Sequence, residues 1–268
     1  MRYAVNIPPF TDPATLVQLA IDAEASGWDG VFVWDHLVWA TRNAPDVHDP
    51  WVLLGAIAQA TERVRLGTLV TPLSRRRVHV VAKQLLTLDH LSSGRVTLGV
   101  GLGEPPVADF SAFGDESDAK IRAAILDEGL GVLDQLLRGA AVDHDGEHLT
   151  AHGQLRPGPI QQPRPPIWVA GVVPNRRPLR RARRWDGVVP IGPQELLTPD
   201  MLAGYLGGDA PPGWDVVATR KEGVPAEEYA DAGATWLVES TWPLDDWVDD
   251  FRSRIRRGPG AGAGVTSQ

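Results

Sequence analysis

Cysteine is missing from this chain of 268 residues. Its absence excludes disulfide bonds, thiol nucleophiles and zinc–thiolate sites. No apolar run approaches the ~20 residues that a membrane-spanning helix needs. The first ten residues, MRYAVNIPPF, lack the apolar core of a secretory signal. We therefore expect a cytoplasmic protein with no membrane partner.

Acidic residues outnumber basic residues, and several catalytic motifs are missing. The formal net charge is −8, which disfavours nucleic acid as a partner. Lysine occurs only as Lys83, Lys120 and Lys221, and only Lys221 is near a predicted strand end, so a Schiff-base mechanism has little support. There is no Gly-x-Ser-x-Gly nucleophile elbow, and no Gly-x-Gly-x-x-Gly follows the first strand. These absences argue against a serine hydrolase and a dinucleotide-binding sheet.

A strand–helix–strand unit is the clearest pattern that is present. Val64–Val70 is an apolar run, Val78–Leu91 has helical spacing, and Val96–Val100 is a second apolar run. Both runs are hydrophobic on both faces, which is typical of a parallel sheet covered by helices.

The same alternation continues along the chain and predicts eight strands and eight helices. About 250 residues in this pattern is the size of a (β/α)8 TIM barrel. We predict one such α/β domain over residues 1–257, with a doubly wound open sheet as the alternative. The predicted strands are 2–7, 30–34, 64–70, 96–100, 167–170, 186–191, 214–219 and 235–239.

Residues 139–166 interrupt this alternation after the fourth helix. Asp145-Gly146 signals a hairpin turn, and the prolines between 157 and 166 exclude a helix. We predict a short excursion on the barrel rim. Residues 258–268 are rich in glycine and alanine, and we expect them to form a disordered tail.

Two candidate catalytic groups follow predicted strands, where a TIM barrel builds its active site. Asp35 and His36 follow the second strand, and histidine gives or takes a proton near neutral pH. Glu104 follows Gly101-Leu102-Gly103, whose glycines would let a flat ligand approach the backbone. The alternatives are a loop histidine held by its neighbour and a solvated glutamate. Of the ten tryptophans, Trp34 and Trp39 are the ones to which we give a functional position.

An anion site is predicted where a helix opens directly after the fifth barrel strand. The segment comprises Gly171, Val172, Val173, Pro174, Asn175, Arg176 and Arg177. Free backbone N–H groups at a helix start favour an anion, and the two arginines add positive charge, so we predict a phosphate site. Arg75–Arg77 form a second basic cluster, which either meets a phosphate or an acidic tail or is solvated.

No metal site is predicted. His144, His148 and His152 are four residues apart, but the turn at Asp145-Gly146 prevents a helix that would align them. The first strand also lacks the His-x-His that metal-dependent barrel hydrolases commonly use.

Several long segments resemble the luciferase-like monooxygenase superfamily. They are DGVFVWDHLVW, LGTLVTPLSRRR, VAKQLLTLDHLSSGRVTLGVGLGE, DEGLGVLDQLL and RPPIWVAG…PLRRARRWDGVVP. The resemblance runs from about Arg2 to Pro190 and more weakly to Ile255. The resemblance implies a TIM barrel that binds FMN or the deazaflavin coenzyme F-420 (F420). It also implies hydride transfer or flavin-dependent oxygenation, and it allows the homodimer that is common in that family.

The resemblance implies residue roles as well. Asp35-His36 matches the Asp-His pair of the F420-dependent branch, in which the histidine lies beside the reactive ring, and Glu104 matches a proton donor. Leu69-Val70 matches a bulge with a non-proline cis peptide behind the ring, and Thr71 would hydrogen-bond the ring edge. The segment from Gly171 to Arg177 matches the part that receives the cofactor phosphate.

Two departures from the family pattern concern the substrate. Some F420-dependent dehydrogenases place a tryptophan four residues after the histidine, where this chain has Ala40, with Trp39 one position earlier. The segments after the fifth to seventh strands are short, which indicates a reduced covering insertion and an open site.

The main hypothesis is a hydride-transferring oxidoreductase that uses F420 or FMN and a small organic substrate. His36 or Glu104 would move the accompanying proton, and Asp35 would fix the imidazole. One alternative is an FMN-dependent monooxygenase supplied by a separate flavin reductase. Others are a flavin-binding protein without catalysis and a phosphosugar-binding barrel.

Overall fold

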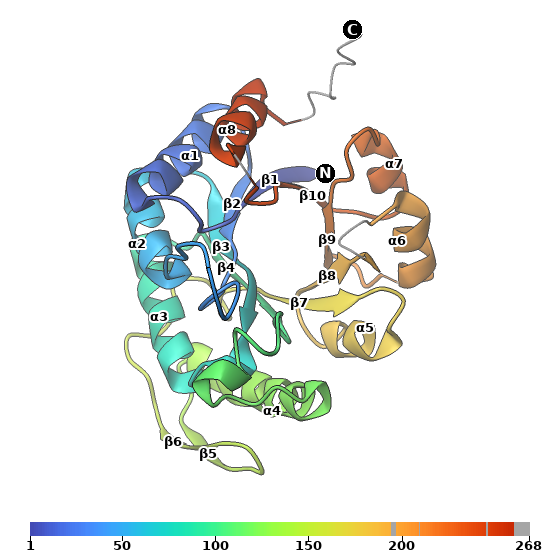
Figure 1. Ribbon diagram of the computed structural model, residues 1–268. Helices are drawn as coiled ribbons and strands as arrows, with labels where there is room; N and C mark the ends of the chain where they lie inside the picture. Colours follow the sequence, from blue (N-terminus) through green and yellow to red (C-terminus); the bar gives the residue numbers. More distant parts are fainter. Residues whose placement is uncertain (194–196, 209, 245, 260–268) are drawn as a thin grey trace, which may run out of the picture.

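Eight parallel strands close into a barrel in the computed structural model, which describes residues 1–193, 197–208, 210–244 and 246–259. Around the barrel the order is β1, β10, β9, β8, β7, β4, β3, β2, with the helices outside (Figure 1). This confirms the predicted fold. The barrel strands are β1 (Arg2–Ile7), β2 (Gly30–Val33), β3 (Arg65–Pro72), β4 (Val96–Gly101), β7 (Ile167–Val172), β8 (Gly187–Ile191), β9 (Asp215–Thr219) and β10 (Trp236–Ser240).

Helices cover the barrel between these strands, and several begin at residues that the sequence marks as caps. Asp12 accepts a hydrogen bond from the backbone of Thr15 (2.9 Å), and Asp49 accepts one from Trp51 (2.9 Å). A proline follows each cap at the first helical position, where its missing N–H costs nothing. The helices are α1 (Pro13–Ala25), α2 (Pro50–Ala60), α3 (Val78–Leu91), α4 (Ala119–Leu137), α5 (Arg176–Ala182), α6 (Pro199–Leu206), α7 (Ala226–Asp231) and α8 (Trp247–Arg257).

One helix begins later than its sequence pattern indicates. The pattern predicts a last helix from residue 244, whereas α8 begins at Trp247. Residues 260–268 of the predicted tail lie outside the described residues. Within the described residues, no helix combines the length and apolar character needed to cross a membrane.

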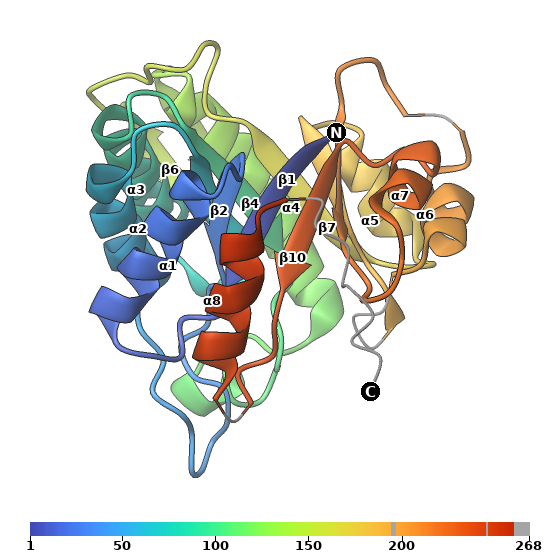
Figure 2. The same ribbon diagram turned by 90° about the horizontal axis from the view of Figure 1, so that it is seen from above.

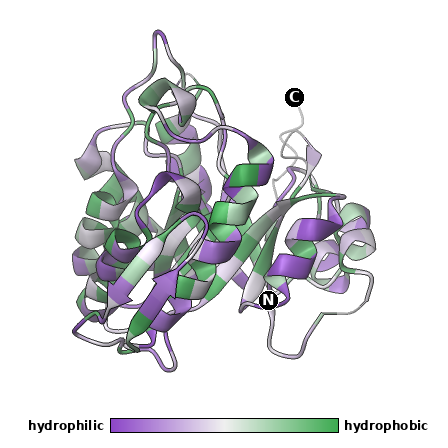
Figure 3. Cartoon of the chain, turned by 90° about the horizontal axis from the view of Figure 1, so that it is seen from below, coloured by the Kyte–Doolittle hydropathy of each residue, from purple (hydrophilic) through white to green (hydrophobic). Residues whose placement is uncertain are grey.

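The main hydrophobic core lies between the barrel and its helices. Leucine, isoleucine, valine and alanine side chains from the strands and from α1, α2, α3 and α4 form one buried cluster. In Figure 3 the helices carry hydrophobic residues beside hydrophilic ones, as expected for helices that cover a barrel with one face.

A second buried cluster fills the barrel interior. Phe32, Trp168 and Trp236 pack with ring centroids 5.3–6.2 Å apart. Asp215 accepts hydrogen bonds from the indole N–H groups of Trp168 (3.1 Å) and Trp236 (3.2 Å). These large side chains fill this part of the barrel interior, and a TIM barrel places its ligand at the C-terminal ends of the strands.

The predicted excursion after α4 is an antiparallel hairpin of β5 (Val142–Asp145) and β6 (Thr150–Gly153). Because it connects the end of a helix to the start of β7, it lies at the end of the barrel where the strands begin (Figure 2). The excursion is therefore remote from the strand ends that form the site.

Candidate active site

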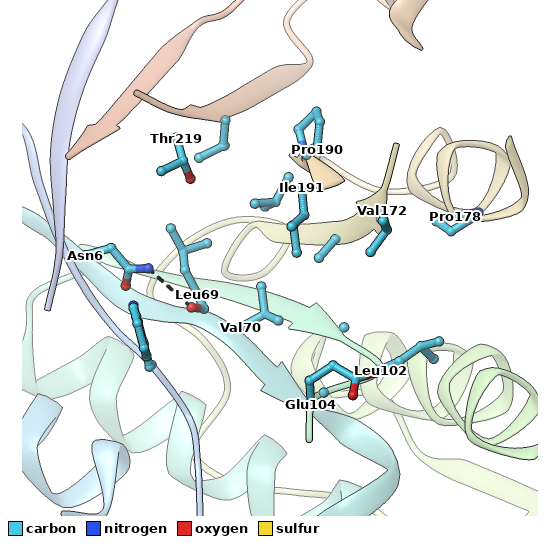
Figure 4. A pocket seen from close by; sticks show the side chains of 18 of the residues that line it. Asn6, Leu69, Val70, Leu102, Glu104, Val172, Pro178, Pro190, Ile191 and Thr219 are labelled. Atoms are coloured by element: carbon cyan, nitrogen blue, oxygen red, sulfur yellow. Dashed lines mark hydrogen bonds between the residues drawn. The ribbon is translucent and has the colours of Figure 1, made fainter. Parts of the chain in front are cut away.

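A cavity of about 650 Å³ opens at the C-terminal ends of the barrel strands. All eight strands, or the residues that directly follow them, contribute to its lining. Figure 4 shows Val70 on one side of this space facing Ile191 and Val172 on the other. The cavity has the size of a small-molecule site and occupies the position where TIM barrels place their chemistry.

The floor of the cavity is the bulge of β3 at Leu69 and Val70. The peptide bond between them is cis, as the family resemblance implies. The pairing of β3 with β4 shifts register between Thr68 and Thr71. Asn6 on β1 donates from Nδ2 to the Leu69 carbonyl (3.5 Å), while its buried Oδ1 has no hydrogen-bond partner among the described residues (Figure 4).

His36 lies at the cavity wall in the loop after β2. Its ring centroid is 4.9 Å from that of Trp39 and 6.0 Å from that of Trp34. Its Nδ1 atom is 3.5 Å from Oδ2 of Asp109. This contact leaves Nε2 as the ring nitrogen that can serve the cavity.

Asp109 is the carboxylate that the sequence analysis missed. Its side chain is fully buried, and Oδ1 accepts from the backbone N–H groups of Leu37 (2.6 Å) and Val38 (3.0 Å). Burial raises the pKa of Asp109, but the His36 ring, the Arg75 charge and the two backbone donors outweigh burial, so the pKa is lowered. Asp109 stays ionised beside His36 at neutral pH. No signal in the sequence marks it, because it lies 73 residues from His36 in a loop without a motif.

Asp35 has a different role from the predicted one. Its buried carboxylate pairs with Arg75 (3.0 Å) and Arg76 (2.6 Å), and it accepts from the Trp51 indole (3.2 Å) and the Thr71 hydroxyl (2.8 Å). With its oxygens occupied in this way, Asp35 does not hold the imidazole. The prediction that Asp35 fixes His36 is therefore wrong, and Asp109 takes that position.

The same network corrects the predictions for Arg75, Arg76 and Thr71. The two arginines were expected to meet an anionic ligand or solvent, but their guanidinium groups neutralise Asp35. Burial lowers the pKa of Arg76, yet the charge of Asp35 outweighs burial and raises it. Thr71 is fully buried and bonded to Asp35, so its hydroxyl is not available to a ring in the cavity.

Glu104 lines the cavity at its rim. Its side chain is 76% exposed and lies 3.9 Å from Arg122, and the Glu104–Pro105 bond is cis. Buried Arg122 donates to the carbonyls of Leu102 (2.9 Å) and Gly103 (2.8 Å), so α4 fixes the loop that carries the glutamate. A Cβ at Gly103 would lie 2.7 Å from Phe110 and from Pro72, which explains the glycine.

The predicted phosphate segment is only partly at the cavity. Gly171, Val172 and Asn175 line it, whereas Val173, Arg176 and Arg177 do not. Arg176 donates to the carbonyls of Tyr205 (2.6 Å) and Gly204 (3.1 Å) at the end of α6. The arginine of this region that does line the cavity is Arg181.

Aromatic side chains form one wall of the cavity mouth. Trp34, Trp39 and Trp242 line the cavity, and Phe10 packs behind them. Trp34 and Trp39 were expected at the site, but Trp242, from the loop after β10, was missed. Only the closed barrel brings residue 242 beside residue 34, where their ring centroids are 5.7 Å apart.

The histidines of the hairpin make pairs instead of a cluster. His144 bonds Glu128 (3.0 Å), and His152 bonds Asp143 (2.6 Å). Within the described part of the chain, no group of three or more His, Cys, Asp or Glu residues is arranged to hold a metal ion.

Comparison with known proteins adds a family context. A sequence model of the family described as luciferase-like monooxygenase matches residues 1–203. The F420-dependent glucose-6-phosphate dehydrogenase of Beutenbergia cavernae is 36% identical over 91% of this chain and 83% of that protein. The enzyme of the same name from Rhodococcus erythropolis is 38% identical over 53% of this chain. That match covers 42% of the Rhodococcus protein, so the chain spans less than half the length of this relative.

Solved structures share the fold. An F420-dependent secondary alcohol dehydrogenase in complex with an F420–acetone adduct superposes with a TM-score of 0.76. The superposition covers 96% of this chain and 99% of the other, and the sequences are 19% identical. At this identity the likeness establishes a common barrel architecture.

Proposed function

Because this chain belongs to the luciferase-like monooxygenase family, we propose that it is an F420-dependent oxidoreductase that transfers a hydride between the coenzyme and a small organic substrate. The observation that carries the proposal is the pair of His36 and Asp109, which lie 3.5 Å apart at the wall of a cavity of about 650 Å³. The names of the relatives from Beutenbergia and Rhodococcus support the coenzyme.

The cavity fits a flat heterocycle with a polar edge. Leu69 and Val70 offer a hydrophobic floor, and buried Oδ1 of Asn6 is an acceptor that still lacks a donor among the described residues. A ring N–H would satisfy it. Gly101 is part of the same surface, since a Cβ there would lie 2.8 Å from Val70. The residues that would hold the coenzyme are Asn6, Leu69, Val70, Gly101, Leu102, Gly103, Gly171, Val172 and Asn175.

The protein's own contribution is to move a proton and orient the partners. The bound coenzyme supplies the hydride acceptor or donor. His36 takes or returns the substrate proton at Nε2, while Asp109 faces Nδ1 at 3.5 Å and orients the ring. Glu104, at the exposed rim, is the second candidate for proton transfer.

The proposal also includes the location and the oligomeric state of the enzyme. We place the enzyme in the cytoplasm and as a homodimer, in line with the sequence-based expectations. If FMN is the coenzyme, the alternative is a monooxygenase to which a separate reductase supplies reduced flavin. Cell fractionation and size-exclusion chromatography with light scattering test the first two attributes.

Titration of the purified protein with oxidised F420 and with FMN, followed by fluorescence quenching, tests the coenzyme. Micromolar or tighter binding of F420 alone supports the proposal. Preferred binding of FMN points to the monooxygenase reading. Tight F420 binding without any reduction or reoxidation in a substrate screen indicates a binding protein, and binding of neither cofactor contradicts the proposal.

His36→Ala tests the proton carrier. We expect turnover to fall roughly 100-fold or more, because a positioned acid–base group contributes at least that much, while F420 affinity changes little. Stopped-flow measurement of coenzyme reduction provides the readout. The control is His79→Ala, an exposed histidine on α3. Unchanged turnover in His36→Ala removes His36 from the mechanism.

A further inference from the structure

The aromatic wall at the cavity mouth is continuous. Trp34 and Trp39 lie 5.9 Å apart between ring centroids, and Trp242 lies 5.7 Å from each of them. Phe10 supports the two former rings from behind at 6.1 and 5.5 Å. The rings pack against one another, so they present an apolar surface and do not enclose a cage for a cation.

This wall is adjacent to the proton carrier. The His36 ring packs edge-on against Trp39 with centroids 4.9 Å apart. A substrate whose body rests on Trp39 and Trp242 would therefore hold an attached oxygen close to the imidazole. The opposite side of the cavity adds hydrophobic groups, among them Val189 and Ile191.

The described lining residues offer little positive charge for a phosphorylated substrate. They include one arginine and no lysine, and this Arg181 is already paired with a carboxylate, since its Nε and Nη2 donate to Asp127 (2.6 and 2.8 Å). Arg75 and Arg76 are occupied by Asp35. The residues outside the description add no positive side chain, since by sequence they are Gln194–Leu196, Asp209, Asp245 and the Gly/Ala-rich segment 260–268.

We propose that the substrate of this site is an uncharged molecule with an apolar, preferably aromatic, body and one oxygen function, and that it is not a phosphorylated sugar. The inference rests on the proposed function for the reaction, but it concerns only what the cavity binds. Placing a phosphate dianion against an indole wall without a partner cation is costly, whereas an aromatic body gains stacking and burial there. The substrate class thus differs from the one in the names of the related dehydrogenases.

Calorimetric titration with defined probes tests the binding preference. The probes are acetophenone and 1-phenylethanol for the proposed class, and glucose 6-phosphate and glucose for the alternative, each with F420-loaded and with cofactor-free protein. We expect the aromatic probes to bind at least tenfold more tightly than glucose 6-phosphate. Their affinity should also change little between low and high salt, since no charge pair is formed.

Variants of Trp242 test the role of the wall. Because this side chain is 44% exposed, Trp242→Ala should fold normally. We expect it to weaken acetophenone binding about 3- to 10-fold, while Trp242→Phe retains most of the affinity. The matched control is Leu244→Ala, which lies in the same loop, is 73% exposed and does not line the cavity.

The outcomes separate this inference from the proposed function. Tighter binding of glucose 6-phosphate than of the aromatic probes overturns the substrate class and leaves the F420 proposal intact. Failure of all probes to bind also overturns it, as does unaltered acetophenone affinity in Trp242→Ala. Absence of F420 binding defeats the proposed function, while the titrations of cofactor-free protein still decide the present inference.

Discussion

Two carboxylates lie near His36, and they differ in their other partners, although Arg75 lies 3.5 Å from Asp109 as well. Arg75 and Arg76 bind Asp35, so that carboxylate belongs to a buried charge network. Breaking such a network by removing one partner is strongly destabilising. Asp109 contacts one nitrogen of the imidazole and receives two backbone N–H groups. At the residue scale, the neighbour in sequence belongs to the charge network, and the distant carboxylate is the one that faces the His36 ring.

Asp109→Asn separates these roles. Asparagine keeps an oxygen for the backbone donors of Leu37 and Val38 but removes the charge that faces His36. We expect kcat to fall, by less than in His36→Ala, while the Kd for F420 stays within about twofold. The nitrogen chemical shifts of His36, measured by NMR, should report a changed tautomer balance.

Two comparisons make this test specific. Asp109→Glu should recover part of kcat, because it restores the carboxylate. Asp115→Asn, in the same loop, is the control and should leave kcat and the NMR signals of His36 as in the wild type. A tautomer balance unaffected by Asp109→Asn would argue against a positioning role.

At the element scale, a glutamate of α1 anchors the start of β3. The Glu24 carboxylate accepts from the backbone N–H groups of Glu62 (2.9 Å), Arg63 (2.6 Å) and Val64 (2.8 Å). Burial raises the pKa of Glu24, but the three backbone donors and the Arg95 charge together lower it by more than burial raises it. The net shift of the pKa is therefore downward. The anchor holds the strand whose other end forms the floor of the cavity.

Glu24→Gln should therefore lower stability in a pH-dependent way. A carboxyl with a depressed folded-state pKa contributes stability above its unfolded pKa of about 4.3, and loses this contribution as pH falls through the folded value. We expect a deficit of about 1–2 kcal/mol at pH 7 that shrinks toward pH 3. Urea unfolding at both pH values provides the measurement, with Glu62→Gln as the exposed control. A deficit independent of pH would contradict the charge argument.

The helices and strands could be predicted from the sequence more completely than the contacts between distant side chains. Caps such as Asp12-Pro13 and Asp49-Pro50 depend on neighbouring residues, so the sequence specifies them locally. The positions of His36 and Glu104 at the cavity could also be predicted, because both residues directly follow strands of the expected barrel. The partner of His36 and the contribution of Trp242 depend on packing between segments that lie 73 and more than 200 residues apart. No local pattern encodes such contacts.

At the scale of the whole molecule, the last helix completes the layer around the barrel. On α8, Phe251 and Ile255 are fully buried, and the Ile255 carbonyl accepts from the Trp28 indole (2.9 Å). Arg256 pairs with Asp22 of α1 (2.9 Å). The first and last helices thus pack together beside β1 and β10, where the barrel closes (Figures 1 and 2).

Phe251→Ala should consequently destabilise the entire fold. We expect a loss of about 3–5 kcal/mol, since a large buried aromatic group is removed and a cavity remains. Chemical denaturation followed by far-UV circular dichroism measures it, and Ser253→Ala on the exposed side of α8 is the control. A loss confined to α8, with the barrel transition unchanged, would show that closure does not depend on this helix.

The two halves of the chain contribute different parts of the cavity, so mutations in one half can change one part of the cavity and leave the other part unaltered. His36, Glu104 and the floor at Leu69 and Val70 come from the first half, whereas Ile191, Thr219 and Trp242 come from the second. Mutations in the later loops can therefore change the cavity wall while His36, Glu104 and the cavity floor stay unaltered. A laboratory library confined to those later positions would sample the same evolutionary freedom.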